Sequence, residues 1–411
     1  MLDNKTAQNR NEIPMNTRNT ILSLAVTVTI VAVAGCGSTR VTNKAQAQAN
    51  WTDARASVSE GLARDQFRGG SIQQARQTID QVLAMTDTRA SSHLLSSQIA
   101  IEQGKLESAE KSLKRAQELD PKDSEIDYFM GIINQRWQRG EQALANYQAA
   151  STKKPADLAY TMAHAEMLVE LNRLQEAIKL LENRVVYFES SSALRDTLAQ
   201  LLERRGAPGD QARAIDLFRQ AVVLEGKDNT ARERWGIALY RAGQYPQSKS
   251  VLSRLLVDAE YAKRVDLMLA VANCELQLGL PSDARTRFEQ VIVLDARQVA
   301  GHVGVAKSSM LLEDFARARI ALSRAAAIKS DSVEVAMLQS TLSIKQQNWA
   351  QADGHLAKVL LLDPSNSTAM ALSALAKSKL GQTEQSRQAM ASAIKVNPND
   401  EWVKQVKSML Q

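Results

Sequence analysis

The chain has 411 residues, of which 44% are hydrophobic and 23% charged, and this excludes a chain that is disordered along most of its length. Aromatic residues make up only 4%, while Ala, Leu, Gln, Arg and Lys are abundant, so the composition favours helix over β-sheet. The net charge of +6 is spread without a long run of Lys or Arg, so nucleic-acid binding is not expected.

The N-terminus has the features of a signal peptide. Residues 21–34, ILSLAVTVTIVAVA, are uncharged and mostly apolar, and as a helix they would span about 21 Å. A membrane-spanning helix must cross about 30 Å of hydrocarbon, so this run is short for that role. Its length suits the apolar part of a signal peptide, with Arg18 as the positive charge before it. We therefore predict a signal peptide over residues 1–35, whose start is either Met1 or Met15.

The apolar run ends in VAGC, residues 33–36, which resembles the lipobox of bacterial lipoproteins. The resemblance implies cleavage before Cys36 and acylation of its sulfur and amine, and two or three acyl chains anchor a protein stably. Residue 37 is Gly rather than Asp, which in the Gram-negative sorting pattern points to the outer membrane, facing the periplasm. An uncleaved signal anchor, with Cys36 as a bystander thiol, remains the alternative.

Residues 36–50 are polar and lack helical apolar periodicity until Trp51, so we predict a lipidated cysteine followed by a short tether. The only other thiol, Cys274, lies in the apolar segment LAVANCELQL and is predicted to be a buried, inert helix cysteine.

The rest of the chain is periodic. Gly131 and Ala143 are 12 residues apart, and Tyr147, Ala150 and Pro155 follow Ala143 at +4, +7 and +12. The same offsets occur 34 residues earlier, at Ser97, Ala109, Leu113, Ala116 and Pro121. Related sets continue to Pro398, and a period of this length indicates a repeat architecture.

This spacing resembles that of the tetratricopeptide repeat (TPR) family. The resemblance implies an all-α solenoid over residues 51–400, a right-handed superhelix of about ten units, each with a helix A, a turn and a helix B. Residues 401–411 are then a capping helix, with Trp402 and Val403 covering the last unit. An all-α bundle with accidental periodicity is the alternative, and the number of successive matches disfavours it.

Small residues at two positions of each unit let helices A and B approach closely, and a larger side chain such as Tyr147 or Phe288 fills the gap to the neighbouring unit. Four glycines are expected in the turn between helix A and helix B: Gly140, Gly243, Gly279 and Gly381.

No catalytic or metal-binding pattern accompanies the repeats. The four histidines, His93, His164, His302 and His355, fall in four different units, and no HxxxH, HExxH, CxxC or GxSxG pattern occurs. GVAKSS at residues 304–309 lacks the adjacent Gly-Lys and the preceding strand of a phosphate-binding loop. We expect no enzyme, no metal, no cofactor and no small-molecule substrate.

The TPR resemblance implies a partner-binding concave face lined mainly by helix A. The apolar residues at those positions are Leu94, Ile101, Tyr128, Ile132, Met162, Ile237, Tyr240, Leu269, Leu276, Met310, Met337 and Ile344. An acidic middle stretch is formed by Glu166, Asp196, Glu203 and Glu233. Such a groove suits an extended or helical segment with apolar anchors and some basic residues. The alternative is that half of these apolar positions are simply packed between helices.

Only Asn273 and Lys307 partly resemble the clamp with which chaperone-binding TPR proteins hold a C-terminal carboxylate, so that mode is disfavoured. The resulting hypothesis is a lipid-anchored scaffold that binds envelope proteins, in the assembly of a pilus, a secretion system or an outer-membrane machine. An organiser of exopolysaccharide synthesis or export is the alternative.

Overall fold

The computed structural model describes residues 39–410, with side chains from residue 43, and within this range the chain is helical and contains no strand. The expected signal peptide, both candidate start residues and Cys36 lie outside the described residues. The helices are α1 (Thr39–Arg68), α2 (Ile72–Met85), α3 (Ala90–Glu102), α4 (Leu106–Leu119), α5 (Ser124–Arg136), α6 (Gly140–Lys153), α7 (Leu158–Glu170), α8 (Leu174–Arg184), the short 3-10 helix η1 (Val185–Tyr187), α9 (Ser192–Arg205), α10 (Asp210–Leu224), α11 (Asn229–Arg241), α12 (Tyr245–Leu255), α13 (Val265–Gln277), α14 (Pro281–Leu294), α15 (Val299–Leu311), α16 (Phe315–Ile328), α17 (Val333–Lys345), α18 (Trp349–Leu362), α19 (Ser367–Lys379), α20 (Thr383–Val396) and α21 (Glu401–Leu410).

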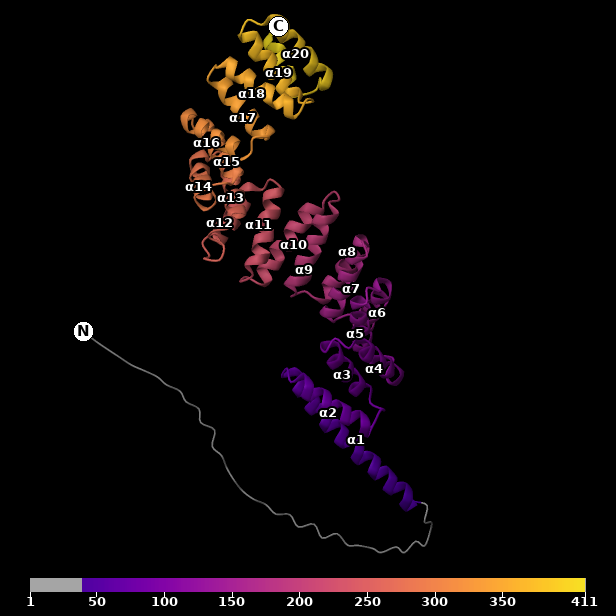
Figure 1. The fold of residues 1–411 in the computed structure, drawn as a ribbon. Helices are drawn as coiled ribbons and strands as arrows, with labels where there is room; N and C mark the ends of the chain where they lie inside the picture. Colours follow the sequence, from indigo (N-terminus) through magenta and orange to yellow (C-terminus); the bar gives the residue numbers. More distant parts are fainter. Residues whose placement is uncertain (1–38, 411) are drawn as a thin grey trace, which may run out of the picture. The chain divides into compact units, whose positions relative to one another are not determined.

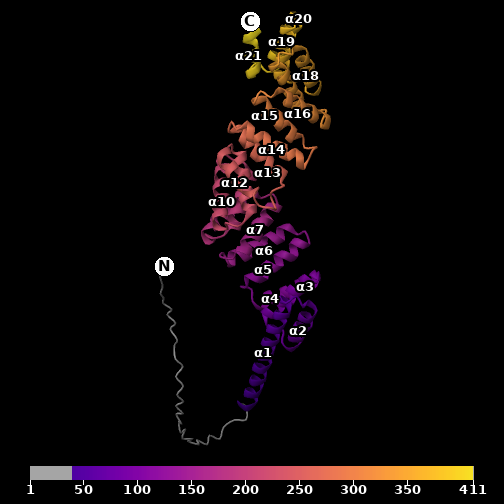
Figure 2. The ribbon, with the colours of Figure 1, turned by 90° about the vertical axis from the view of Figure 1, so that its left-hand side faces the viewer.

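The helices pack in pairs (Figure 1). The chain divides into two compact units. The first unit ends at Asp87 and contains one described pair, α1 and α2, whose interface buries Ala56, Ala63 and Ile79. The second unit runs from Thr88 and holds α3 to α21. In it each odd-numbered helix from α3 to α19, here called helix A, packs on the following helix B. Each helix B also packs on the next helix A, so the pairs follow one another in series (Figure 2).

Helix α1 begins at Thr39, within the segment that was expected to be a tether up to residue 50. Residues 43–50, NKAQAQAN, are exposed, so no apolar face holds this part of the helix. Ala, Gln and Lys are good helix formers, and extending an existing helix avoids the cost of nucleation. The tether was expected because this segment lacks apolar periodicity. Its intrinsic helix propensity explains why it is helical instead.

Close approach between helices depends on glycine at several positions. A Cβ added to Gly236 in α11 would lie 2.3 Å from Leu252 Cδ2 in α12, and one added to Gly304 in α15 would lie 2.3 Å from Phe288 Cδ1 in α14. The first contact lies within a pair and the second joins two successive pairs. The role predicted for Phe288, filling the gap to the neighbouring unit, agrees with this packing.

The turn between helices A and B uses one left-handed residue. Gly243, Gly279 and Gly381 have φ values of 72°, 71° and 75° at this position, as expected. The expectation for Gly140 is wrong: Gly140 is the first residue of α6, and Gln138 holds the left-handed position with φ 58°. Gly140 is instead required by packing, because a Cβ there would lie 2.8 Å from Leu171 Cδ2.

The last helix, α21, covers the end of the array, packing on α19 and α20. Val403 and Val406 are buried. Trp402 was expected to cover the last pair as well, but it is 48% exposed. Successive residues of a helix point about 100° apart, so Trp402 cannot share the face of Val403. Asp400 caps α21 by accepting hydrogen bonds from the N–H groups of Trp402 and Val403.

Candidate functional site

The expected binding residues lie on helices A of the second unit, on what is called below the helix A face. Three of them are part of the core, because Leu94, Ile101 and Met310 are at most 7% exposed. The others remain half-buried and accessible at their outer edge: Tyr128, Ile132, Met162, Ile237, Tyr240, Leu269, Leu276, Met337 and Ile344. The helix A face therefore presents a row of partly exposed apolar side chains on α5, α7, α11, α13 and α17.

Aromatic side chains gather at the α5–α7 end of this face. The ring of Tyr128 lies 4.9 Å from that of Tyr160 and 5.8 Å from that of Tyr147, measured between centroids. The Tyr147 hydroxyl donates a hydrogen bond of 2.8 Å to Gln135 Oε1. Sequence reasoning named Tyr128 and Tyr147 separately and missed Tyr160, because the contact is made between different repeats.

Burial raises the pKa of Tyr128, and the nearby carboxylates of Asp157 and Glu166 raise it further. The pKa of Tyr147 is raised chiefly by burial, with contributions from Tyr128 and Glu166. Both phenols therefore stay protonated at physiological pH. Glu166 itself is exposed on α7, beside the half-buried Met162.

The other carboxylates of the expected acidic stretch are held by arginines. Asp196 accepts a hydrogen bond of 2.5 Å from Arg234, and Glu233 forms an ion pair of 2.6 Å with Arg264. Glu203 has Arg241 at 3.6 Å. Each arginine belongs to, or directly precedes, the next helix A. The centre of the face is therefore a series of paired charges, and the expectation of an acidic centre is corrected.

The residues that partly resemble a carboxylate clamp do not form one. Lys307 is engaged in an ion pair of 2.7 Å with Glu334. Asn273 is half-buried and forms a side-chain hydrogen bond with Tyr240. The pKa of Tyr240 is raised chiefly by burial. Cys274 is fully buried beside it, as expected, and burial raises the pKa of its thiol.

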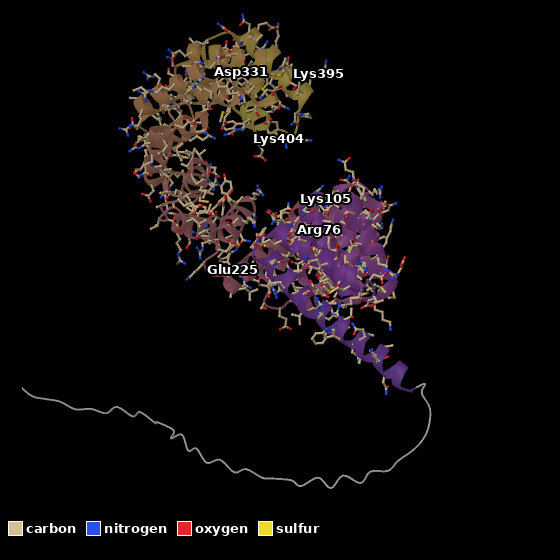
Figure 3. All side chains as sticks on the ribbon, turned by 60° about the horizontal axis from the view of Figure 1, so that its bottom comes forward. Arg76, Lys105, Glu225, Asp331, Lys395 and Lys404 are labelled. Atoms are coloured by element: carbon tan, nitrogen blue, oxygen red, sulfur yellow. The ribbon has the colours of Figure 1, made fainter. Side chains whose placement is uncertain are left out.

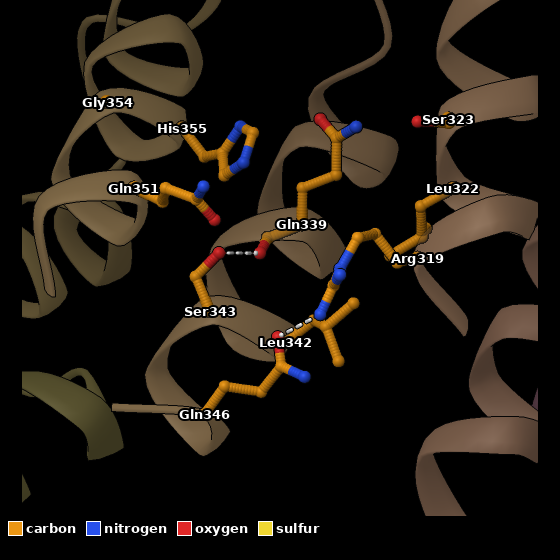
Figure 4. Close-up of a pocket in the computed structure, with 10 residues that line it drawn as sticks. All are labelled: Arg319, Leu322, Ser323, Gln339, Leu342, Ser343, Gln346, Gln351, Gly354 and His355. Atoms are coloured by element: carbon orange, nitrogen blue, oxygen red, sulfur yellow. Dashed lines mark hydrogen bonds between the residues drawn. The ribbon is translucent and has the colours of Figure 1, made fainter. Parts of the chain in front are cut away.

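A polar pocket that sequence reasoning missed lies between α16, α17 and α18 (Figure 4). It has a volume of about 410 Å³ and is lined by Arg319, Ser323, Gln339, Ser343, Gln346, Gln351 and His355, with Leu322, Leu342 and Gly354. Arg319 donates to Gln346 Oε1 at 3.2 Å. Burial lowers the pKa of His355, and Lys358 lowers it further. The pocket faces away from Met337 and Ile344, so it is not part of the helix A face.

Among residues 39–410 no group of three or more His, Cys, Asp or Glu side chains is placed to hold a metal ion. In the same range, no helix combines the length and apolar character needed to cross a bilayer.

Two family models, both described as tetratricopeptide repeat, match residues 60–124 and 367–400. This chain carries tetratricopeptide repeats. The helix pairs packed in series make it an all-α solenoid of TPR units, an architecture suited to protein–protein interaction.

Several solved structures are similar to the chain. The C-terminal part of a TPR repeat-containing protein from Cytophaga hutchinsonii is 16% identical, with 61% of this chain and 99% of that one covered and a TM-score of 0.47. A tetratricopeptide repeat protein from Parabacteroides merdae is 18% identical, with 62% and 98% covered and a TM-score of 0.39. MamA from Desulfovibrio magneticus RS-1 is 16% identical, with 43% and 96% covered and a TM-score of 0.39.

Proposed function

We propose that this chain is a lipid-anchored TPR scaffold that holds proteins together in a bacterial cell envelope, in the assembly of a pilus, a secretion system or an outer-membrane machine. The proposed anchor is Cys36, at the end of an apolar run that suits a signal peptide and within a motif that resembles a lipobox. The proposed site of partner binding is the helix A face.

The observation that carries the binding proposal is the cluster of Tyr128, Met162 and Glu166 on α5 and α7. Aromatic and methionine side chains that are half-buried before binding lose little conformational freedom when a partner covers them. The exposed carboxylate of Glu166 beside them favours a partner segment that carries an apolar anchor next to Lys or Arg.

The anchor is tested by the variant Cys36→Ser, expressed at native level and fractionated. Loss of the variant from membranes washed with high salt is the expected result, because serine has no thiol to carry an acyl chain. Retention of the variant in the washed membranes would contradict lipid anchoring.

The binding face is tested by crosslinking mass spectrometry in cells, on the membrane fraction. Crosslinks from the helix A face to one envelope complex are expected, and they would name the machine. The double variant Tyr128→Ala, Glu166→Lys should lose them, whereas Glu107→Lys, a charge reversal at an exposed site on α4, should retain them. Equal crosslinking by both variants would contradict the assignment of the face.

A further inference from the structure

A row of exposed apolar side chains runs along the ends of helices B, away from the helix A face. In six successive repeats the residue nine positions after the small residue of helix B is apolar and exposed: Val186, Val223, Val257, Val293, Ala327 and Leu361. The five larger ones are 66%, 72%, 85%, 85% and 81% exposed. These six residues are called the helix-B ridge below. Single exposed apolar residues are ordinary, but recurrence at one position of six successive repeats produces a row of them.

In the repeats on either side of the ridge, the equivalent position is occupied by a polar residue. The same position is Glu118 in α4 and Thr152 in α6, before the ridge begins. After it ends, the position is Lys395 in α20, which is exposed (Figure 3). The apolar residue is therefore a property of the middle repeats and not a requirement of the repeat fold.

Hollows accompany the ridge. One cavity of about 390 Å³ lies between α14 and α16, where Val293, Ile292 and Ile320 contribute apolar walls. A second, of about 550 Å³, lies on the other side of Val293 and is lined by Met268 and Leu294 among others. Both hollows adjoin Val293, and a ridge whose side chains recur once per repeat is complementary to a surface with the same spacing. A second copy of this chain has that spacing by construction.

Charges flank the ridge on both sides. At the end of helix B, the repeat of Ala327 carries the exposed Lys329. The carboxylates just beyond the ridge are Glu225 (labelled in Figure 3), Asp258, Asp295 and Asp363. Their side chains accept hydrogen bonds from the neutral donors Ser192, Asn229, the Arg297 backbone N–H and Ser365. One helical turn before the ridge are Arg254, Arg324 and Lys358, of which Arg254 and Arg324 are exposed.

We propose that the helix-B ridge is the surface on which a second copy of this chain packs, side by side and with its repeats running in the same direction. A two-fold axis along the ridge places Arg254 and Lys358 of each copy opposite Asp258 and Asp363 of the other. A two-fold axis across the ridge would place like charges opposite each other, which is repulsive. The row of carboxylates also disfavours an anionic membrane surface as the occupant.

The extent of the ridge is adequate for such a contact. Together with the half-exposed Leu224, Leu294 and Leu362, its side chains offer on the order of 800 Å² of surface per copy, which is what a standard interface buries on each partner. The parallel arrangement brings every ridge residue next to its own counterpart. This dimer is independent of the helix A face, which stays free for other proteins.

The first test is the mass of the full-length protein in detergent, measured by light scattering after size exclusion. The wild type is expected at twice the mass of one mature chain, and the double variant Val257→Glu, Val293→Glu at the mass of one. The matched control is Val58→Glu, which changes a valine that is 76% exposed on α1, outside the ridge, and should leave the dimer intact. A wild type that stays monomeric, or a control that is monomeric too, overturns the proposal.

The second test keeps the ridge native apart from one side chain, so it does not depend on the folding of the double variant. Single cysteines replace Val223, Val293 and Leu361, and a short bismaleimide is added, with the wild type and its own cysteines as the baseline. Parallel packing predicts a crosslinked dimer from all three variants and none above baseline from Gln277→Cys, an exposed site at the far end of α13. Crosslinking at one ridge position only would indicate a crosswise axis, and crosslinking at none would exclude the interface.

Discussion

Gly131 in α5 lies directly against the ring of Tyr147 in α6, so closely that a Cβ on Gly131 would be 2.6 Å from Tyr147 Cδ1. Within this pair, the approach of helix A to helix B therefore depends on the absence of a side chain. The ring in turn contacts Tyr128, which belongs to the proposed binding face.

The variant Gly131→Ala is expected to lower the free energy of unfolding by about 1–3 kcal/mol, because the ring or the helix must move to admit a methyl group. Gly354→Ala is the matched control, since a Cβ at Gly354 in α18 meets nothing within 4 Å. Alanine there should stabilise by about 0.5–1 kcal/mol through helix propensity. Urea unfolding of both variants measures the two effects, and equal signs would contradict the packing argument.

The turn after α17 places a non-glycine residue in the left-handed region, with Gln347 at φ 57°. Gln347→Gly should raise the melting temperature, since the left-handed conformation costs an L-residue about 1–2 kcal/mol. The reciprocal variant is Gly381→Ala, at φ 75° in the equivalent turn, which should lower the melting temperature. If the two shifts have the same direction, backbone strain is not the cause.

His164 is buried, and its Nδ1 lies 3.0 Å from Ser151 Oγ. Burial lowers the pKa of His164 to about 4, with smaller contributions from Arg184 and Arg173. In the unfolded chain the imidazole of His164 becomes protonated near pH 6.5, whereas in the folded chain it becomes protonated only near pH 4. The stability contributed by the neutral ring is complete above pH 6.5 and falls between pH 6.5 and 4. His164→Gln should remove that part of the pH dependence in urea titrations, and an unchanged profile would contradict it.

Asp400 joins α21 to the last repeat by accepting hydrogen bonds from Ser367 and Thr368 as well as from the α21 backbone. Burial raises the pKa of Asp400, but these hydrogen bonds outweigh it and hold the pKa below the ordinary value of 3.8. Its contribution to docking is present above pH 3.8 and is lost as the pH falls through the lowered pKa.

The variant Asp400→Ala should destabilise α21 by about 1 kcal/mol at neutral pH, as for other helix caps. Faster amide hydrogen exchange in residues 401–410, with unchanged exchange in α5 and α6, is the expected result. Unchanged exchange in α21 would show that Val403 and Val406 hold this helix without the cap.

The repeat architecture could be predicted because one pattern recurs with a period near 34 residues. Small residues such as Gly131 and Ala143 mark the helix contacts, and prolines such as Pro155 mark the turn between pairs. These residues meet local requirements of a helix pair, and the same pattern recurs in each repeat. Apolar periodicity alone was a weaker guide at the start of α1, where helix propensity extends the helix to Thr39.

The candidate site was predictable only in part. Periodicity placed Tyr128, Met162 and Glu166 on one face, but it could not show that Arg234 and Arg264 neutralise Asp196 and Glu233. Those partners are more than 30 residues away and belong to, or directly precede, the next helix A, so their distance depends on how two repeats stack.

The sequence by itself determined that this chain is a series of helix pairs, since the spacing of small, large and turn-forming residues is a one-dimensional property. The tertiary structure decided which side chains are buried, paired or free. It joined Tyr128, Tyr147 and Tyr160 into one cluster, and it left the valines of the helix-B ridge exposed. The physical reason is that burial and charge pairing arise between repeats, where side chains distant in sequence share the same space.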